Sequence, residues 1–546
     1  MLESSVSIPI GMRHPSIAPN GMVTSPHHLA SAAGADVLRA GGSAIDAAIA
    51  TSAVLAVVYP HMTSIGGDAF WLIHEGRTGR VRFLNGGGKA AGASTIEAFE
   101  SLGRSEIPFR GVLPATLTVP GAVASWIEAH KAHGRLPLTS VLECAIGYAR
   151  DGFPVTARLA AFIASTKSEL LQDAETASIF LPNGDAPTVG AKLTNVNLAR
   201  TIARLAEGGW SGFYEGETAR EMSQFAEERG GFFRAKDFMA QTAKWGEPLL
   251  GTYRDVTIFN TPPPTQGFAV LEMLNLLEPY RLWERPRFGA DMVHLMVQAK
   301  QIAYHDRDRY LADPTFTDVP IDRLISKAYA EERRKLIRED RALAWDDVPS
   351  YGSLAGDTVY VAAVDRDGNA ASLIQSLYGV FGSAVVAGRT GVVLQNRGAY
   401  FSMDRSHPNR LEPGKIPLHT LIASMAKRDE KLWAVLGCMG ADGQPQIQMQ
   451  AYVSLIDHAV DIQEALDAPR FLSGRFALGE PRDSLHIEGR FPAKTIDELE
   501  RRGHIVDRWG AWNEFAGHAH GIVINAQTGF CHGGSDPRSD GAAIGY

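Results

Sequence analysis

Residues 357–376 follow the pattern of a β-hairpin whose first strand opens with a threonine. Thr358 starts a β-branched and apolar run, an Asp- and Gly-rich stretch covers residues 365–369, and a second apolar run continues through residue 376. This pattern predicts two adjacent antiparallel strands. If Thr358 became a chain terminus, its own α-amine could serve as the base for its hydroxyl. On the pattern alone, a plain strand-opening threonine is the simpler interpretation.

The size and charge of the chain narrow its class. With 546 residues it exceeds one ordinary hydrophobic core, so several layers or two intertwined subunits are expected. The net charge of -8 argues against a nucleic-acid partner and against docking on anionic membranes. Residues 1–20 lack the apolar core of a secretory signal. We therefore expect a cytoplasmic protein, or a periplasmic one if a signal has been removed.

The cysteine and histidine positions indicate neither a metal site nor a cofactor. The three cysteines, Cys144, Cys438 and Cys531, show no disulfide or metal spacing, so we expect a buried structural thiol at each. His518 and His520 place two imidazoles on one strand face, but a metal needs further ligands, and a structural pair is favoured. The chain carries no phosphate loop and no dinucleotide fingerprint. We expect no metal and no cofactor.

The order of helix and strand patterns predicts a layered α/β protein. Residues 29–40 and 44–58 have helical patterns, and the second, capped by Ser43, is apolar nearly all round, which indicates burial between layers. Residues 120–345 are mostly helical, and residues 346–355 form a polar linker. The segments expected after the linker are strands 359–364, 371–376, 391–394, 433–436 and 521–525, with helices 445–456 and 462–468.

Several spaced blocks of residues carry a family signature. They are HLASAAG (28–34), GGSAIDAA (41–48), PPP (262–264), AYHDR (303–307), and DT (357–358) with DRDGN (365–369). In these blocks the chain resembles the γ-glutamyltranspeptidases, which are N-terminal nucleophile hydrolases. The resemblance implies a four-layer αββα sandwich and self-cleavage between Asp357 and Thr358. It further implies a large subunit, 1–357, and a small subunit, 358–546, intertwined in one domain, and it suggests a dimer of these processed units.

The resemblance assigns catalytic roles by position. It implies that Thr358 is the nucleophile and that Ser376 supplies a hydroxyl that assists it during processing. Gly440 and Ala441 stand where the family has a Gly-Gly pair whose backbone N–H groups form an oxyanion hole. Alanine adds a Cβ, which matters if the φ angle at Ala441 is positive. For Ser376, a solvated strand serine remains the alternative.

The substrate pocket departs from the family pattern. Gly87 replaces a carboxylate-binding Arg, Arg397 supplies another guanidinium, and Tyr400 replaces an Asp that would pair with an α-ammonium group. Lys89 is a weaker partner for a carboxylate, and a structural ion pair is the alternative for Arg397. The pocket positions marked by the resemblance are Gly87, Tyr378, Arg397, Tyr400, His419 and Thr420.

These departures predict an acyl substrate that carries a carboxylate without an α-amino group, with Arg397 binding the carboxylate through two hydrogen bonds. The motifs QNRG (395–398) and HT (419–420) resemble a family branch that includes oxamate amidohydrolase and acylase-like members. The expected partner is a small amide, either oxamate-like or a dicarboxyl monoamide. Two alternatives remain open: a genuine γ-glutamyltransferase or glutathione hydrolase of glutathione metabolism, and an unprocessed scaffold without enzymatic activity.

Overall fold

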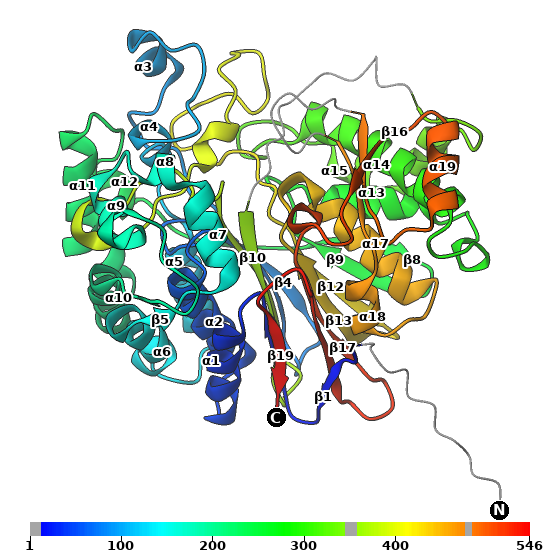
Figure 1. Ribbon diagram of the computed structural model, residues 1–546, viewed down its shortest axis with the longest axis horizontal. Helices are drawn as coiled ribbons and strands as arrows, with labels where there is room; N and C mark the ends of the chain where they lie inside the picture. Colours follow the sequence, from blue (N-terminus) through cyan, green and yellow to red (C-terminus); the bar gives the residue numbers. More distant parts are fainter. Residues whose placement is uncertain (1–12, 344–356, 475–482) are drawn as a thin grey trace, which may run out of the picture.

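The computed structural model describes residues 13–343, 357–474 and 483–546. Two β-sheets lie face to face, and helices cover the outer face of each sheet (Figure 1). The expected four-layer αββα sandwich is therefore confirmed. The predicted linker at 346–355 and most of the N-terminal segment in which a signal was sought lie outside the described residues.

Both central sheets have seven strands within the described residues. In spatial order, the first sheet contains β19 (Ala542–Gly545), β2 (Met22–Ser25), β10 (Asp357–Val364), β11 (Ala370–Tyr378), β3 (Asp68–His74), β4 (Val81–Gly86) and β7 (Lys244–Gly246). The second contains β1 (Ser16–Ala18), β18 (Cys531–Ser535), β17 (Ala519–Ile524), β13 (Lys431–Cys438), β12 (Ala423–Arg428), β9 (Val256–Asn260) and β8 (Leu249–Tyr253). Two smaller sheets join β14 (Phe471–Ser473), β15 (Ser484–Glu488) and β16 (Ile505–Trp509), and β5 (Phe153–Pro154) with β6 (Lys192–Leu193).

Two sets of helices form the outer layers. Over the first sheet lie α1 (His28–Arg39), α2 (Ala44–Val58), α3 (Ile96–Ser101), α4 (Val112–Ala115), α5 (Ala122–His133), α6 (Leu138–Asp151), α7 (Ala157–Ser165), α8 (Lys167–Leu170), α9 (Ala174–Phe180), α10 (Val196–Tyr214), α11 (Glu217–Glu228) and α12 (Ala235–Met239). Over the second lie α13 (Phe268–Leu277), α14 (Ala290–Tyr310), α15 (Ile321–Leu324), α16 (Lys327–Arg334), α17 (Gln444–Ile456), α18 (Ile462–Asp467) and α19 (Ala493–Arg501). The short 3-10 helices are η1 (Pro182–Gly184), η2 (Leu282–Glu284), η3 (Gly388–Thr390), η4 (Arg397–Tyr400), η5 (Ala441–Gly443) and η6 (Glu514–Ala516).

The helix α2 is buried along its whole length, as its apolar composition predicts. Its first turn carries a reciprocal cap, in which Ser43 Oγ accepts a hydrogen bond from Asp46 N and Asp46 Oδ2 accepts one from Ser43 N. The Asp46 carboxylate also accepts a hydrogen bond of 2.8 Å from Arg135 N. The cap therefore starts the helix and also ties it to the segment that leads into α6.

The layer between the two sheets is filled by alternate side chains of the facing strands. Phe70, Tyr360 and Ile374 from the first sheet meet Met425 and Ile522 from the second in one buried cluster. The intervening side chains of β10 and β11 point to the helices outside the first sheet. Because side chains alternate along a strand, the even-numbered residues of β10 and β11 face the space between the sheets.

The predicted hairpin is confirmed as β10 and β11, which pair antiparallel from Val359↔Gln375 to Val364↔Ala370. In the turn, Asp365 Oδ1 accepts hydrogen bonds from Asp367 N and Asn369 N, each of 3.0 Å. The strands β2 and β3 flank the hairpin on its two sides, so it lies in the interior of the first sheet.

Two expectations about secondary structure need correction. Residues 391–394 do not form a strand, because Gly391 adopts a left-handed φ of 70° and only single bridges, such as Val386↔Val393, flank the segment. The mostly helical stretch from 120 to 345 also contains the hairpin of β8 and β9, which the sequence analysis missed. Each of these strands has five residues, which is too short for the alternation of apolar and polar residues to indicate a strand clearly.

The expectation of three buried thiols is wrong for one cysteine. Cys438 and Cys531 are buried, whereas Cys144 is exposed. Cys144 lies in α6, whose buried residues are Val141, Leu142, Ala145 and Ala149, so the thiol falls on the opposite face of the helix.

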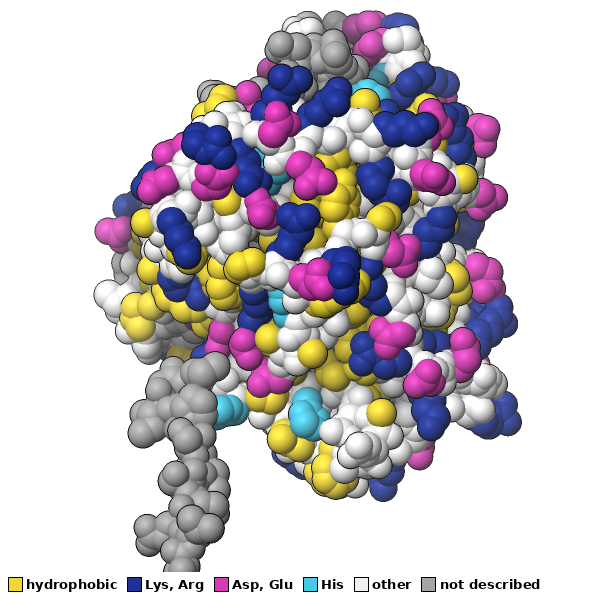
Figure 2. Space-filling view, turned by 90° about the vertical axis from the view of Figure 1, so that its right-hand side faces the viewer, with side chains coloured by type: hydrophobic (Ala, Val, Ile, Leu, Met, Phe, Trp, Pro, Cys, Tyr) yellow, Lys and Arg dark blue, Asp and Glu magenta, His cyan; other side chains and the backbone are white. Residues whose placement is uncertain are grey.

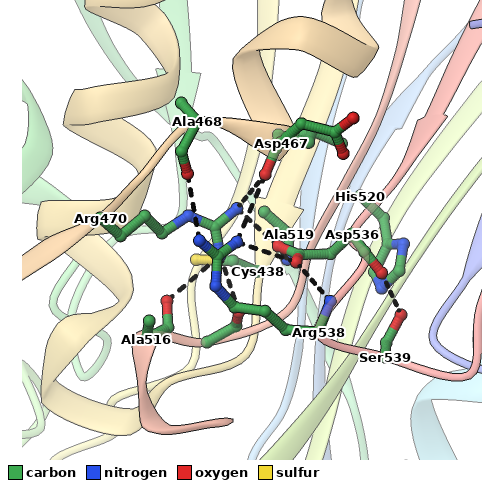
Figure 3. A network of polar contacts seen from close by, with 12 residues as sticks. Cys438, Asp467, Ala468, Arg470, Ala516, Ala519, His520, Asp536, Arg538 and Ser539 are labelled. Carbon is green, nitrogen blue, oxygen red and sulfur yellow. Dashed lines mark hydrogen bonds and ion pairs between the residues drawn. The ribbon is translucent and has the colours of Figure 1, made fainter. Parts of the chain in front are cut away.

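A buried ion-pair network joins the C-terminal segment to the three-stranded sheet (Figure 3). Asp536 contacts Arg470 at 2.5 Å and Arg538 at 3.1 Å. Arg538 also contacts Glu488 of β15 at 2.5 Å. Burial acts to raise the pKa of Asp536, but the two guanidinium groups outweigh it and hold that pKa below its usual range. Both buried arginines of this network therefore have carboxylate partners.

The outer face formed by the helices of the second sheet carries charges of both signs. Lys and Arg side chains are interspersed there with Asp and Glu and do not gather in one large patch (Figure 2). Across the described ranges, no helix combines the length and apolar character needed to cross a bilayer.

Candidate active site

Thr358 lies at the start of β10 with its side chain buried between the two sheets. The register of β10 against β11 is interrupted between Asp357 and Val359, which places Thr358 in a bulge. A bulge bends its strand and re-aims a side chain. The Thr358 hydroxyl donates a hydrogen bond of 3.2 Å to Ser376 Oγ on the neighbouring strand. The structure therefore brings together the two hydroxyls that the sequence analysis paired, and neither is a solvated strand residue.

Arg397 continues this polar chain. Its Nη2 donates to Ser376 Oγ and its Nη1 donates to Thr420 Oγ1, each at 3.1 Å. Two aromatic rings enclose the guanidinium group: its central carbon lies 4.8 Å from the centre of the Tyr378 ring and 5.4 Å from that of Tyr400. The geometry thus joins Arg397 to the predicted nucleophile through one intervening hydroxyl.

Arg397 differs from the other buried arginines in its partners. It is fully buried, yet none of the described carboxylates pairs with it, and its Nε atom has no hydrogen-bond partner among the described residues. Arg307 and Arg470, in contrast, contact Asp442 and Asp536. Burial lowers the pKa of Arg397, but guanidinium groups keep their proton at neutral pH. The structural ion pair considered for Arg397 is therefore not formed within the described part of the chain.

The ring of Tyr378 forms one wall of this region. Its centre lies 4.3 Å from that of Tyr400 and 5.3 Å from that of Phe109. Tyr378 has a left-handed φ of 83°, a conformation that is rare for a bulky residue, and its N–H donates to Ser376 Oγ at 2.8 Å. This strained turn fixes where β11 ends and aims the tyrosine at Arg397.

His419 lies beside a carboxylate that the sequence analysis did not single out. His419 Nε2 is 3.2 Å from Asp68 Oδ2, and both side chains are fully buried. Burial lowers the pKa of His419 to about 4, although Asp68 opposes this shift. The imidazole is therefore neutral at physiological pH. The other Asp68 oxygen accepts hydrogen bonds from Gly121 N at 3.1 Å and from Gln395 Nε2 at 2.9 Å.

A sequence signal for Asp68 was present, because this acidic residue follows Gly66-Gly67 at the first position of β3. The contact between Asp68 and His419 could not be predicted, because the two residues are far apart in the sequence.

Gly440 and Ala441 form the turn between β13 and α17. Gly440 has a φ of 138° and Ala441 a left-handed φ of 45°, so the added Cβ of Ala441 lies in a conformation that favours glycine. Both residues are buried, and neither N–H has an acceptor among the described residues. Two adjacent backbone donors without described acceptors are available to donate to an oxyanion.

Gly87 and Lys89 stand apart from this hydrogen-bonded chain. A Cβ on Gly87 would lie 3.1 Å from the Phe70 ring, which packs edge-on against His419 at 4.7 Å between ring centres. Lys89 is half-buried, and desolvation lowers its pKa. Of the predicted pocket residues, Arg397 contacts Tyr378, Tyr400 and Thr420 directly. Gly87 instead lies next to the Phe70 ring, which packs against His419.

Within the described ranges no group of three or more His, Cys, Asp or Glu side chains is arranged to hold a metal ion. His518 Nε2 lies 3.0 Å from Glu514 Oε1. Burial lowers the pKa values of both His518 and His520 to about 3, so both rings are neutral.

A sandwich whose interior strand presents a buried threonine that contacts a serine, which in turn contacts an arginine, has the features of an N-terminal nucleophile hydrolase. The family model described as gamma-glutamyltranspeptidase matches residues 30–546. The chain therefore belongs to the γ-glutamyltranspeptidase family, a family of hydrolases and acyltransferases.

The relatives agree over nearly the whole chain. It is 42% identical to the glutathione hydrolase-like YwrD proenzyme of Bacillus subtilis, over 96% of this chain and 98% of that protein. It is 38% identical to the oxamate amidohydrolase proenzyme of Klebsiella pneumoniae, over 98% of this chain and 100% of that protein. The crystal structure of cephalosporin acylase from Bacillus halodurans superposes with a TM-score of 0.91 at 36% identity, and covers 100% of this chain and 99% of that one.

Proposed function

We propose that this chain is a self-processing amidohydrolase that uses Thr358 to hydrolyse small amides whose acyl part carries a carboxylate. The proposal rests on the surroundings of Arg397. Its guanidinium group is fully buried and donates to two hydroxyl groups, but it has no carboxylate partner among the described residues. A buried charge is normally paired. A substrate carboxylate at Arg397 would supply that pairing, one residue away from the Thr358 hydroxyl.

Processing would begin with attack of Thr358 Oγ1 on the carbonyl carbon of Asp357. The peptide C–N bond breaks as the acyl group moves from nitrogen to oxygen, and the resulting ester is opened by water. This leaves a carboxylate on Asp357 and a free α-amine on Thr358. Ser376 lies 3.2 Å from the attacking oxygen and is placed to assist the transfer of its proton. The names of the proenzyme relatives support such a cut, which would separate residues 1–357 from 358–546.

Turnover would then use the new terminus. An α-amine has a pKa near 8, so it can accept the Thr358 hydroxyl proton as the oxygen attacks the amide carbonyl. The N–H groups of Gly440 and Ala441 would donate to the oxyanion. The leaving amine takes the proton from Thr358, and water then hydrolyses the acyl-enzyme. Hydrolysis of one amide consumes one water molecule and needs no cofactor.

Neutral groups around Arg397 favour an acyl part without an α-ammonium group. Tyr378, Tyr400 and Thr420 surround the guanidinium, and the neutral His419 ring lies next to Thr420. None of these groups carries the negative charge that would form an ion pair with an α-ammonium group. Relatives named oxamate amidohydrolase and acylase support the same substrate class.

A glutathione hydrolase is the second candidate. It is favoured by the relative at 42% identity that is named glutathione hydrolase-like and by the glutathione hydrolase of Escherichia coli at 32% identity. For this function the Asp442 and Asp68 carboxylates would have to hold the α-ammonium group. Asp442 already pairs with Arg307, which weakens this candidate. Asp68 Oδ2 lies 3.2 Å from the neutral His419 ring and has no hydrogen-bond partner among the described residues, so Asp68 is the carboxylate that an α-ammonium group would have to use.

A substrate panel separates the candidates. Purified protein would be assayed with oxamate, succinyl and glutaryl amides, glutathione and a γ-glutamyl anilide, and Thr358→Ala would serve as the inactive control. We expect turnover of the carboxylate amides to exceed that of the γ-glutamyl compounds. Dominant γ-glutamyl turnover would instead establish the second candidate. A single band on a denaturing gel, identical for wild type and Thr358→Ala and without turnover, would point to the scaffold.

A further inference from the structure

Gln266 lies in the loop between β9 and α13, beside the segment that carries two pocket residues. Gln266 N donates a hydrogen bond of 3.1 Å to His419 O, and His419 N donates one of 2.8 Å to Pro264 O. The loop therefore runs alongside His419 and Thr420 as a backbone-paired ribbon. Gln266 is fully buried there, although it is a polar residue.

The side-chain amide of Gln266 connects two parts of the site. Its Nε2 donates to Thr420 O at 2.9 Å and to Ala441 O at 3.0 Å. Thr420 is the residue whose hydroxyl contacts Arg397, and Ala441 belongs to the turn with free N–H groups. One amide nitrogen thus uses both of its hydrogens to link the substrate side of the site to the oxyanion side.

Arg307 fixes the orientation of this amide. Its Nη1 donates to Gln266 Oε1 at 2.9 Å and to Asp442 Oδ1 at 2.6 Å. A guanidinium group only donates hydrogen bonds, so the oxygen of Gln266 must face Arg307 and the nitrogen must face the two carbonyls. Tyr304 adds a hydrogen bond from its hydroxyl to Asp442 O. The residue after Ala441 is therefore held from two directions.

The turn at Ala441 needs such support. A non-glycine residue with a φ of 45° is strained and persists where its surroundings hold it. The carbonyl of Ala441 has a buried donor in Gln266, and the next residue, Asp442, is held by Arg307 and Tyr304. These contacts hold the peptide groups that aim the N–H bonds of the turn.

We infer that Gln266 is a positioning residue that holds the oxyanion turn at Ala441 in its left-handed conformation and in register with Thr420. Gln266 itself touches no reacting atom. The inference rests on the proposed function, because it concerns the donors that would stabilise the oxyanion during amide hydrolysis. It applies to any amide that the enzyme accepts.

The test compares Gln266→Met, which keeps the side-chain length and removes the donors, with wild type on the best amide of the substrate panel. Rates are expressed per Thr358 terminus, counted by N-terminal analysis. We expect kcat to fall about tenfold or more, as for a catalytic group displaced by a fraction of an ångström. Gln463→Met is the matched control: Gln463 is also buried and donates to Ser535 O, away from the site. It should leave kcat unchanged.

Repeating the comparison in a protein that carries Ala441→Gly distinguishes a positioning role of Gln266 from a general loss of structure. Glycine adopts a positive φ without strain, so a turn with Ala441→Gly should depend less on Gln266. We therefore compare the double variant Gln266→Met, Ala441→Gly with the single variant Ala441→Gly. The fall in kcat between these two proteins should be at least about threefold smaller than the fall from wild type to Gln266→Met. If Gln266→Met does not fold, Arg307→Lys replaces it, because one ammonium group cannot keep the guanidinium fork; we expect a severalfold lower kcat.

The outcomes distinguish the two proposals. If wild type turns over an amide and Gln266→Met has the same kcat, the positioning role alone is overturned. The same holds if Gln266→Met lowers kcat equally whether residue 441 is alanine or Ala441→Gly is present. If Arg307→Lys is the variant used, an unchanged kcat overturns that role in the same way. A wild type without turnover of any amide in the panel would overturn the proposed function together with the role of Gln266.

Discussion

At the scale of single residues, the site is organised around the hydroxyl of Ser376. Among the described residues, its oxygen accepts hydrogen bonds from the Thr358 hydroxyl at 3.2 Å, the Arg397 guanidinium at 3.1 Å and the Tyr378 backbone N–H at 2.8 Å. A positive charge beside this oxygen stabilises negative charge that develops on it or on Thr358. Under the proposed function, Arg397 would act on the Thr358 nucleophile as well as on a substrate carboxylate.

Replacing Arg397 by lysine tests this double contact. A single ammonium group cannot reach Ser376 Oγ and Thr420 Oγ1 with the fixed fork of a guanidinium. We expect kcat/KM of Arg397→Lys on carboxylate amides to fall by about ten- to a hundredfold, the effect of losing one charge-assisted hydrogen bond. Steady-state kinetics measure it, with Arg389→Lys, a change at an exposed residue of the short helix η3, as the matched control. Equal kinetics for wild type and Arg397→Lys would contradict a role of Arg397 in substrate binding.

At the scale of elements, the helices α13, α14 and α16 meet around two buried carboxyl groups. Glu272 of α13 is fully buried, and desolvation together with the nearby Asp306 of α14 raises its pKa well above the usual range. Asp306 accepts a hydrogen bond of 2.9 Å from the Tyr329 hydroxyl and lies 3.4 Å from Arg333 Nε. Asp306 therefore joins α14 to α16 through a hydrogen bond and an ion pair. Folding therefore favours the protonated form of Glu272.

The raised pKa of Glu272 predicts a pH dependence of stability. Its pKa is raised on folding, so its contribution is fully present below the unfolded value near 4.5 and is lost as pH rises toward the folded value. Within that window the loss approaches about 1.4 kcal/mol per pH unit. Glu272→Gln has no proton to lose, so its free energy of unfolding should fall less steeply above pH 5. Urea denaturation of the unprocessed Thr358→Ala chain at several pH values measures the difference.

The control for this prediction is Glu331→Gln, a change of the same kind at an exposed position of α16. It should keep the wild-type pH slope. Parallel slopes for Glu272→Gln and wild type would show that Glu272 is ionised in the folded state.

At the scale of the whole molecule, the chain before residue 357 and the chain after it share both sheets. In the first sheet, β10 and β11 lie between β2 and β3. In the second, β18, β17, β13 and β12 lie between β1 and β9. Separating the two segments would break ladders in both sheets and open the apolar layer between them.

This interleaving predicts that processed protein stays together. A denaturing gel should show two bands of about 39 and 20 kDa, when the 59.0 kDa chain is apportioned by length at the cut before Thr358. Size-exclusion chromatography in native buffer should give a single peak that contains both fragments. Thr358→Ala should show one band on the gel and elute at the same native volume. Fragments that separate without denaturant would contradict the interleaved arrangement.

Much of the fold follows from local signals. The hairpin of β10 and β11 was predictable because two apolar runs flank a turn rich in Asp and Gly, and α2 because Ser43 caps an apolar run. The β8–β9 hairpin and the exposure of Cys144 were not, because the strands are short and helix orientation depends on packing. The resemblance supplied the pocket positions, but it gave no partners for them.

The amino-acid sequence by itself determined the family and the candidate nucleophile, since both rest on blocks of neighbouring residues. Only the tertiary structure decided what surrounds Thr358. Asp68 meets His419, and Gln266 reaches Thr420, 154 residues away, because the two sheets and their loops pack against each other. Caps, turns and periodicity act over a few residues. Contacts between distant segments arise from layer packing, and these contacts leave Arg397 buried beside the threonine without a described carboxylate partner.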